Sequence, residues 1–90
     1  MNERKERPDR PENVRQAVER FGALHGISKP YVTSAFAKAC GVSRQAVFYW
    51  MQDNVVPVER VELVCMLTGA RAADLNPVLR SLLSNPTRPA

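Results

Sequence analysis

The chain has 90 residues, a length that fits one small domain and leaves no room for a deep active-site cleft. Its apolar fraction of 44% is ordinary for a folded protein, and its net charge of +4 favours a polyanionic partner without specifying one. No apolar run approaches the length of a membrane span and no signal-peptide pattern opens the chain, so we expect a cytoplasmic protein without a membrane partner.

Residues that commonly carry chemistry are few. Two cysteines, Cys40 and Cys65, and one histidine, His25, are too few and too far apart for a zinc site. No Gly-rich phosphate loop, paired carboxylates or Ser/His/Asp set occurs. We therefore expect no enzymatic activity, no metal, no cofactor and no small-molecule ligand, and we interpret both cysteines as buried, reduced thiols.

The N-terminal third begins with a charged segment. Residues 1–12 hold four basic and four acidic side chains and almost no apolar ones, which predicts a disordered, solvated segment; the alternative, an arm that grasps DNA, is disfavoured by its neutral net charge. From about residue 13 a helix is predicted up to Gly26, and a loop from there to about Val32. The apolar stripe of this helix is Val14, Ala17, Val18, Phe21 and Leu24.

Residues 33–52 read as two short helices around a tight turn. The first helix is predicted over 33–39 and the second over 44–52. Ala37 is small where two helices approach, and Gly41 follows four residues later, where the backbone needs positive φ. Ser43 can accept from the free N–H groups of the second helix. This spacing resembles the helix-turn-helix of phage repressors and Cro proteins; an ordinary corner in a helical domain is the alternative.

The C-terminal half is also predicted to be helical. A helix is expected from Pro57 to Gly69, one helical turn at 72–75, and a short fifth helix from Pro77. The stripe of the Pro57 helix is Val58, Val61, Val64, Cys65 and Thr68, and that of the fifth helix is Val78, Leu79, Leu82 and Leu83. The predicted domain therefore spans 13–84, with a frayed tail at 85–90.

The second helix of the corner divides into two faces. Ala46, Val47 and Trp50 form its inward face. The side chains left to the outward face are Ser43, Arg44, Gln45, Phe48, Tyr49 and Gln52. Arg44 can pair with guanine, Gln45 with adenine, and Phe48 can touch a thymine methyl group. Tyr49 and Gln52 are expected to reach phosphates, as is Thr33 at its helix N-terminus, whereas Phe48 has a dimer contact or the core edge as its alternative role.

Four segments together suggest a family. The stretches 41–50, 56–60, 68–69 and 74–77 resemble the YdaS/Cro-like family of small prophage transcriptional regulators, and the resemblance covers roughly residues 14–79. It implies an all-helical, five-helix, repressor-like DNA-binding fold. Two departures are a longer stretch between the first two helices and Thr33 where many relatives carry Gln.

The resemblance and the corner lead to one functional expectation and one alternative. We expect a sequence-specific regulator that binds double-stranded DNA as a homodimer, using part of the fifth helix and the face near Asn54–Val56. The four apolar residues of the fifth helix could instead simply close the core. A helical protein-interaction module or toxin–antitoxin component that does not read DNA is the alternative function.

Overall fold

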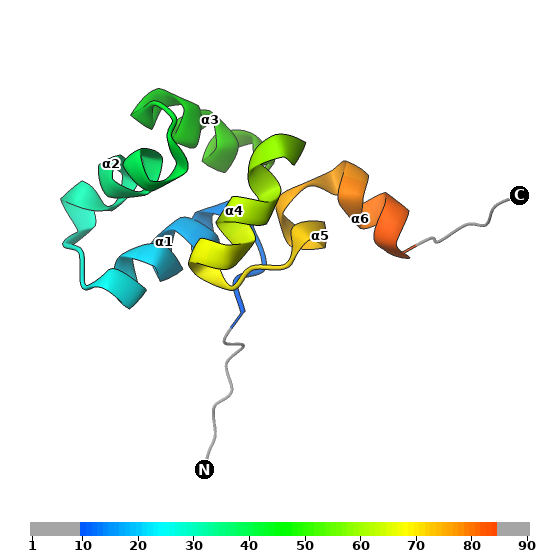
Figure 1. Ribbon diagram of the computed structural model, residues 1–90, viewed down its shortest axis with the longest axis horizontal. Coiled ribbons are helices and arrows are strands. Elements are labelled where there is room, and N and C mark those ends of the chain that lie inside the picture. Colours follow the sequence, from blue (N-terminus) through cyan, green and yellow to red (C-terminus); the bar gives the residue numbers. More distant parts are fainter. Residues whose placement is uncertain (1–9, 85–90) are drawn as a thin grey trace, which may run out of the picture.

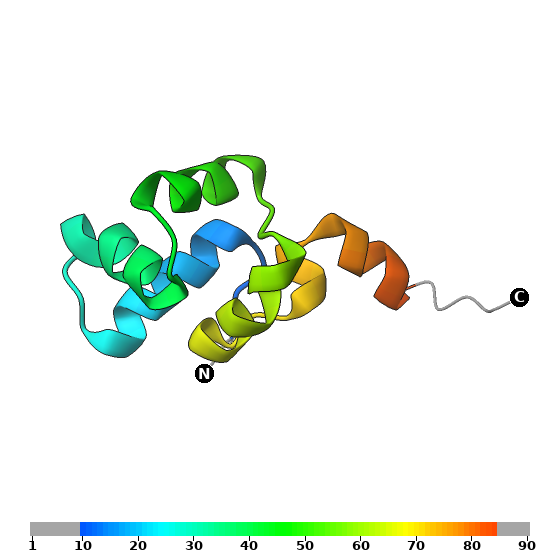
Figure 2. The same cartoon turned by 45° about the horizontal axis from the view of Figure 1, so that its top comes forward.

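The computed structural model describes residues 10–84, and this part of the chain is all-helical, with no strand. Its helices are α1 (Val14–His25), α2 (Lys29–Cys40), α3 (Arg44–Asp53), α4 (Val58–Thr68), α5 (Ala72–Leu75) and α6 (Pro77–Ser84). The first four gather around one core, while α6 extends to one side of them (Figures 1 and 2). The predicted disordered segment spans 1–12, of which 1–9 lie outside the described residues, as does the predicted frayed tail at 85–90. For 10–12 the prediction of a solvated segment is wrong in part, because Pro11 is buried and the Glu12 N–H donates to Oε1 of Gln16 at 2.8 Å.

Helix α1 begins and ends at the predicted residues. The Asn13 side chain accepts a hydrogen bond from the Gln16 N–H at 2.8 Å, and Gly26 ends the helix with φ of 62°. Four residues of the predicted stripe are buried, but Leu24 is 56% exposed. His25 is exposed as predicted, and its ring contacts that of Phe21, with the two centroids 4.5 Å apart.

Helix α2 begins four residues earlier than the sequence predicted. Ser28 has extended backbone, and its carbonyl oxygen accepts from the Tyr31 N–H at 2.9 Å. Pro30 then occupies the first turn, where a missing N–H costs nothing. The predicted loop up to Val32 is therefore wrong, and so is the inference of a long connection: only residues 26–28 separate α1 from α2.

A close approach of α1 and α2 depends on Gly22. A Cβ atom at this position would lie 2.6 Å from Cγ2 of Val32, a distance that real Cβ atoms do not tolerate. The rings of Phe21 and Phe36 meet edge to face in the same region, with centroids 5.2 Å apart. Helix α1 thus lies directly on α2, which fixes the position of the corner that α2 makes with α3.

The core draws side chains from α1 to α5 and from the links between them. Its fully or nearly fully buried apolar members include Val14, Ala17, Phe36, Cys40, Val47, Trp50, Val56, Val64 and Leu75. In α4 the prediction holds for Val61, Val64 and Thr68, but Val58 is 57% exposed because it is the first residue of the helix, at the rim of the core.

Candidate nucleic-acid interface

The turn between α2 and α3 has the predicted geometry. Gly41 has φ of 72°, and its N–H donates to the Lys38 carbonyl oxygen at 3.1 Å. The next N–H, from Val42, reaches back to Ala37 at 3.0 Å. Ser43 then caps α3, because its Oγ accepts from the Ala46 N–H at 3.0 Å. We call residues 29–53 the α2–α3 corner.

Helix α3 separates its side chains as its periodicity predicted. Val47 and Trp50 are buried and Ala46 is half-buried against the core. All six side chains predicted on the outward face are exposed: Ser43, Arg44, Gln45, Phe48, Tyr49 and Gln52. Phe48 and Tyr49 are 49% and 55% exposed, so two aromatic rings face solvent on one short helix.

Besides the Ser43 cap, hydrogen bonds involve three of these outward side chains, Arg44, Gln45 and Tyr49. Nη1 of Arg44 donates to Oγ of Ser34, on α2, over 3.5 Å. Nε2 of Gln45 donates to the Tyr49 hydroxyl, one turn later on α3, over 3.1 Å. The polar face of α3 is therefore partly organised before any partner binds.

Thr33 does not lie where the sequence placed it. It is the fifth residue of α2 and is half-buried, so its backbone N–H belongs to the interior of the helix. The predicted phosphate contact at a helix N-terminus is therefore wrong for Thr33. The first turn of α2 instead carries Lys29, which is exposed.

A hollow of about 480 Å³ lies between α1, α2 and α3. Phe48 and Met51 border it from α3, and Thr33 borders it from α2. The remaining lining residues are Arg15, Val18, Glu19, Gly22, Ala23, Ile27, Lys29 and Val32. Phe48 therefore borders the hollow and is also 49% exposed, so it is not a core residue.

The distribution of charge distinguishes the corner from the rest of the surface. From Arg20 to Gln52 the sequence contains no Asp or Glu, although it contains Lys29, Lys38 and Arg44. All three of these cations are exposed. A count of charges in short windows of the sequence would have found this stretch without carboxylates, whereas the net charge of the whole chain does not show it.

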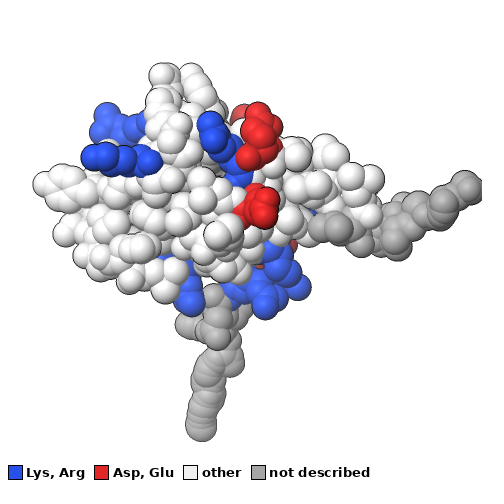
Figure 3. Space-filling model, viewed as in Figure 1, with Lys and Arg blue, Asp and Glu red and all other residues white. Residues whose placement is uncertain are grey.

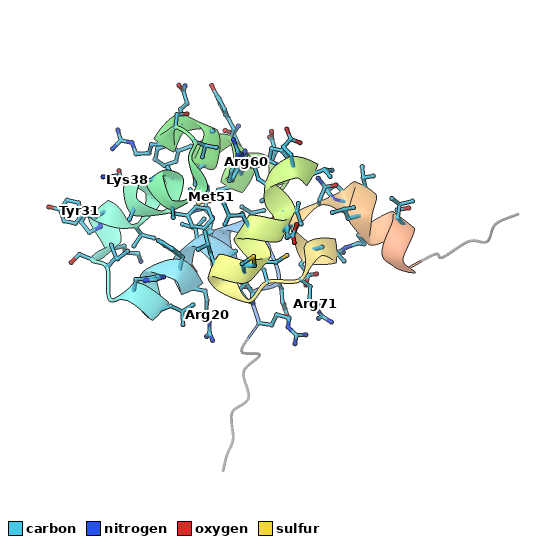
Figure 4. All side chains as sticks on the ribbon, viewed as in Figure 1. Arg20, Tyr31, Lys38, Met51, Arg60 and Arg71 are labelled. Atoms are coloured by element: carbon cyan, nitrogen blue, oxygen red, sulfur yellow. The ribbon has the colours of Figure 1, made fainter. Side chains whose placement is uncertain are left out.

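The pictures show how the charges are arranged on the surface. In Figure 3, acidic side chains gather over the start of α4, whereas basic side chains lie at the α2–α3 end of this face, beside the acidic group and along the lower edge of the molecule. Figure 4 places Lys38 and Tyr31 on α2, and Arg20 and Arg71 at the opposite edge of the molecule. Asp53 is the last residue of the corner, and Glu59, Glu62 and Asp74 follow it in the chain. Residues 29–52 of the corner therefore carry positive charge only, which favours contact with a polyanion.

Two asparagines support the end of α3 through hydrogen bonds that the sequence did not predict. Asn54 has φ of 58°, and its Oδ1 accepts from the Val14 N–H at 2.9 Å, which ties α3 to the start of α1. Nδ2 of the buried Asn76 donates to the Val56 carbonyl oxygen at 2.7 Å. The Val56 N–H donates to Leu75 at 2.7 Å. Val56 is fully buried and cannot contact a partner, whereas Asn54 is exposed and Val55 is half-buried, so the dimer face near Asn54–Val56 stays a prediction without Val56.

Helix α6 presents apolar side chains to solvent. Val78 is 60% exposed and Leu82 is 63% exposed, while Leu79 packs partly against the core. The Leu83 side chain lies outside the described residues. The alternative that the apolar residues of this helix simply close the core is therefore wrong for Val78 and Leu82.

The cysteines carry no sign of a metal site or a reactive thiol. Cys40 is buried and Cys65 is half-buried. Burial raises the pKa of the Cys40 thiol, against a smaller opposing effect of Arg60, and burial also raises the pKa of the Cys65 thiol. Within residues 10–84, no cluster of His, Cys, Asp or Glu is arranged to hold a metal ion, and no helix is long and apolar enough to cross a membrane.

Comparisons of the chain with protein-family models, with curated proteins and with solved structures find no match. The resemblance to the YdaS/Cro-like family therefore stays a prediction from the sequence motifs, and the functional argument depends on the geometry and charge of the α2–α3 corner.

Proposed function

We propose that this protein is a sequence-specific, DNA-binding transcriptional regulator of the Cro/repressor type, whose α2–α3 corner acts as a helix-turn-helix. The observation that carries the proposal is the outward face of α3, which offers exposed hydrogen-bonding and aromatic side chains over residues 43–52, before the carboxylate of Asp53 at the end of the helix. A major groove about 12 Å wide accepts one α-helix, and a face without negative charge can approach its phosphates.

The exposed residues divide into base-reading and backbone-binding roles. The guanidinium of Arg44 matches guanine O6 and N7, the amide of Gln45 matches adenine N6 and N7, and the Phe48 ring matches a thymine methyl group. Phosphates are left to side chains at the edges of this face: Lys29, Lys38, Ser43, Tyr49 and Gln52. Lys29 takes over the role that the sequence assigned to Thr33.

Operator recognition requires more than one such helix. A single reading helix covers too few base pairs for specificity against a genome, and repressors of this type pair two of them about 34–36 Å apart. The exposed Val78 and Leu82 on α6 support a homodimer, because burial of apolar surface drives association. In this proposal the dimer occupies an operator in the cytoplasm, in keeping with the resemblance to prophage regulators.

Selection of bound duplexes from a random pool, followed by salt titration, tests the proposal. A regulator enriches one sequence motif, and the logarithm of its binding constant falls by about 0.9 per phosphate contact for each unit in the logarithm of salt concentration. Lys38→Ala should weaken binding and reduce this slope. The matched control is Arg20→Ala, which removes one exposed positive charge at the opposite edge of the molecule and should leave the slope closer to that of the parent (Figure 4).

The rival function is a helical protein-interaction module or toxin–antitoxin component that does not read DNA. The exposed apolar residues Val78, Leu82 and Met66 favour it, since such side chains fit a protein partner. A module of this kind would enrich no duplex from the pool. Its partner binding would change little with salt, because apolar contacts release no counterions.

A further inference from the structure

The hydrogen bond between Gln45 and Tyr49 has a consequence for base reading. The two residues lie one turn apart on the exposed face of α3, and Nε2 of Gln45 donates to the Tyr49 hydroxyl at 3.1 Å. A glutamine side chain is long and loses much rotamer freedom when it becomes ordered. Here Tyr49 restricts that freedom in the unbound protein.

We propose that Tyr49 is a positioning residue that makes Gln45 a reader of adenine; this inference rests on the proposed function. The amide group has two N–H donors and one carbonyl acceptor. When one N–H is held by Tyr49, the other N–H and the carbonyl oxygen stay available. These are the donor for N7 and the acceptor for the N6 amino group of adenine. The bond to the Tyr49 hydroxyl thus orients the free N–H and the carbonyl oxygen of the Gln45 amide.

Among residues 10–84, Tyr49 is the hydrogen-bond partner of the Gln45 side chain. Arg44, its neighbour, is drawn toward Ser34 on α2 and does not bond to the amide. The sequence contains no carboxylate between Glu19 and Asp53, and Asp53 lies eight residues beyond Gln45, at the far end of α3. The hydroxyl proton of Tyr49 is not used in this bond, because the oxygen accepts, and it remains available to a phosphate. Tyr49 therefore combines the phosphate role expected from the sequence with an orienting role.

The decisive variant is Tyr49→Phe, which removes only the hydroxyl group. The matched control is Tyr31→Phe, which removes the hydroxyl of a 66% exposed tyrosine on α2. The measured quantity is the ratio of affinities for the selected duplex and for one in which the adenine read by Gln45 is replaced. Tyr49→Phe should lower this ratio roughly two- to tenfold, the effect of one ordinary hydrogen bond. Tyr31→Phe should not change it.

A double-mutant cycle separates orientation from other effects. In a Gln45→Ala background, Tyr49→Phe should no longer change the ratio, since the side chain that it orients is gone. Additive effects of the two substitutions would overturn the proposal. So would equal losses on the selected and the replaced duplex, which would reduce Tyr49 to a phosphate contact.

A measurement without DNA completes the test. In ¹⁵N-correlated NMR spectra, Tyr49→Phe should shift the side-chain amide signals of Gln45, and Tyr31→Phe should leave them in place. Unshifted Gln45 signals would overturn the proposal whatever the DNA result. If the parent protein selects no sequence, the proposed function fails together with the reading role. If it selects a sequence whose adenine preference survives Tyr49→Phe, only the inference about Tyr49 fails.

Discussion

The α2–α3 corner and the α5–α6 segment differ in the residues that they leave exposed, and the second also buries a polar side chain. In the corner, apolar Val47 and Trp50 are inside and the polar side chains of α3 are outside. In the α5–α6 segment the polar Asn76 is 5% exposed, whereas apolar Val78 and Leu82 are 60% and 63% exposed. Helix α6 packs against α5 and extends away from the other helices (Figure 2).

In the proposed function, this difference would suit the two regions to different contacts. The corner contributes Val47 and Trp50 to the core and exposes mainly hydrogen-bonding side chains, which would suit a polar partner. In the α5–α6 segment the buried Asn76 holds the Val56 backbone by a hydrogen bond, and the exposed apolar side chains would suit an apolar partner. A regulator that reads DNA with one region and pairs with a second copy through the other would need this division.

The largest expected effect on stability comes from removing the hydrogen bonds of the buried Asn76 side chain. Asn76→Ala removes the amide that donates to Val56 and the Oδ1 that accepts from the Val78 N–H at 2.9 Å. Each buried group left unpaired costs about 1–3 kcal/mol, so we expect a loss of roughly 2–4 kcal/mol in the free energy of unfolding by urea titration. The exposed Gln52→Ala should stay within about 0.5 kcal/mol of the parent. Equal midpoints for the two variants would contradict the role given to Asn76.

The next effect tests the turn of the corner. Gly41→Val should destabilise by about 1–3 kcal/mol, because a β-branched residue tolerates positive φ poorly. Nothing lies within 4 Å of a Cβ at this position, so the cost comes from the backbone and not from a clash. Gly41→Asn is the matched control and should retain most of the stability, as Asn54 already adopts φ of 58°. A thermal melt of Gly41→Val that coincides with that of the parent would refute the assignment.

The third effect concerns recognition and not stability. Arg44→Ala and Gln45→Ala should each lose about 1–3 kcal/mol of discrimination between the selected sequence and a substituted one. Both side chains are exposed, so unfolding should change by no more than about 0.5 kcal/mol. Binding titrations with both duplexes measure the difference. Parallel losses on selected and random DNA would assign these residues to the phosphate backbone.

The smallest effect on stability is expected at α6. Leu82→Glu should change the free energy of unfolding of the monomer by less than about 0.5 kcal/mol, because Leu82 is 63% exposed. Sedimentation should nevertheless show weaker self-association, and gel-shift titration on a palindromic duplex should lose cooperativity. Met66→Glu, at a 76% exposed position of α4, is the control for added charge. A Leu82→Glu protein that dimerises like the parent would remove this part of α6 from the interface.

The sequence by itself determined most of the helix ends and the two faces of α3. Asn13, Gly41 and Ser43 act on groups three or four residues away, so their effect is local and can be read from spacing. The same holds for the inward Val47 and Trp50, which one helical period places on one side. The order of the helices, including the single turn of α5, was predictable for this reason.

The start of α2 was decided by tertiary structure. Pro30 is compatible with a loop and with the first turn of a helix, and the sequence around it does not choose between them. In the folded protein Pro30 lies in the first turn of α2, and the next turn packs on α1 with Val32 against Gly22. Helix α2 therefore has one more turn before Thr33 than the sequence predicted. That one change moved the expected phosphate contact away from Thr33.

Only the tertiary structure decided which members of an apolar pattern are covered. Leu24 and Val58 fit their stripes but are exposed, because they lie at helix ends beyond the reach of neighbouring helices. Val56 has no periodicity of its own, yet it is fully buried, because Asn76 and Leu75 bind its backbone from 19 or 20 residues further along the chain. Periodicity gives the direction of a side chain relative to its own helix, whereas burial depends on what lies opposite, and contacts distant in sequence set that.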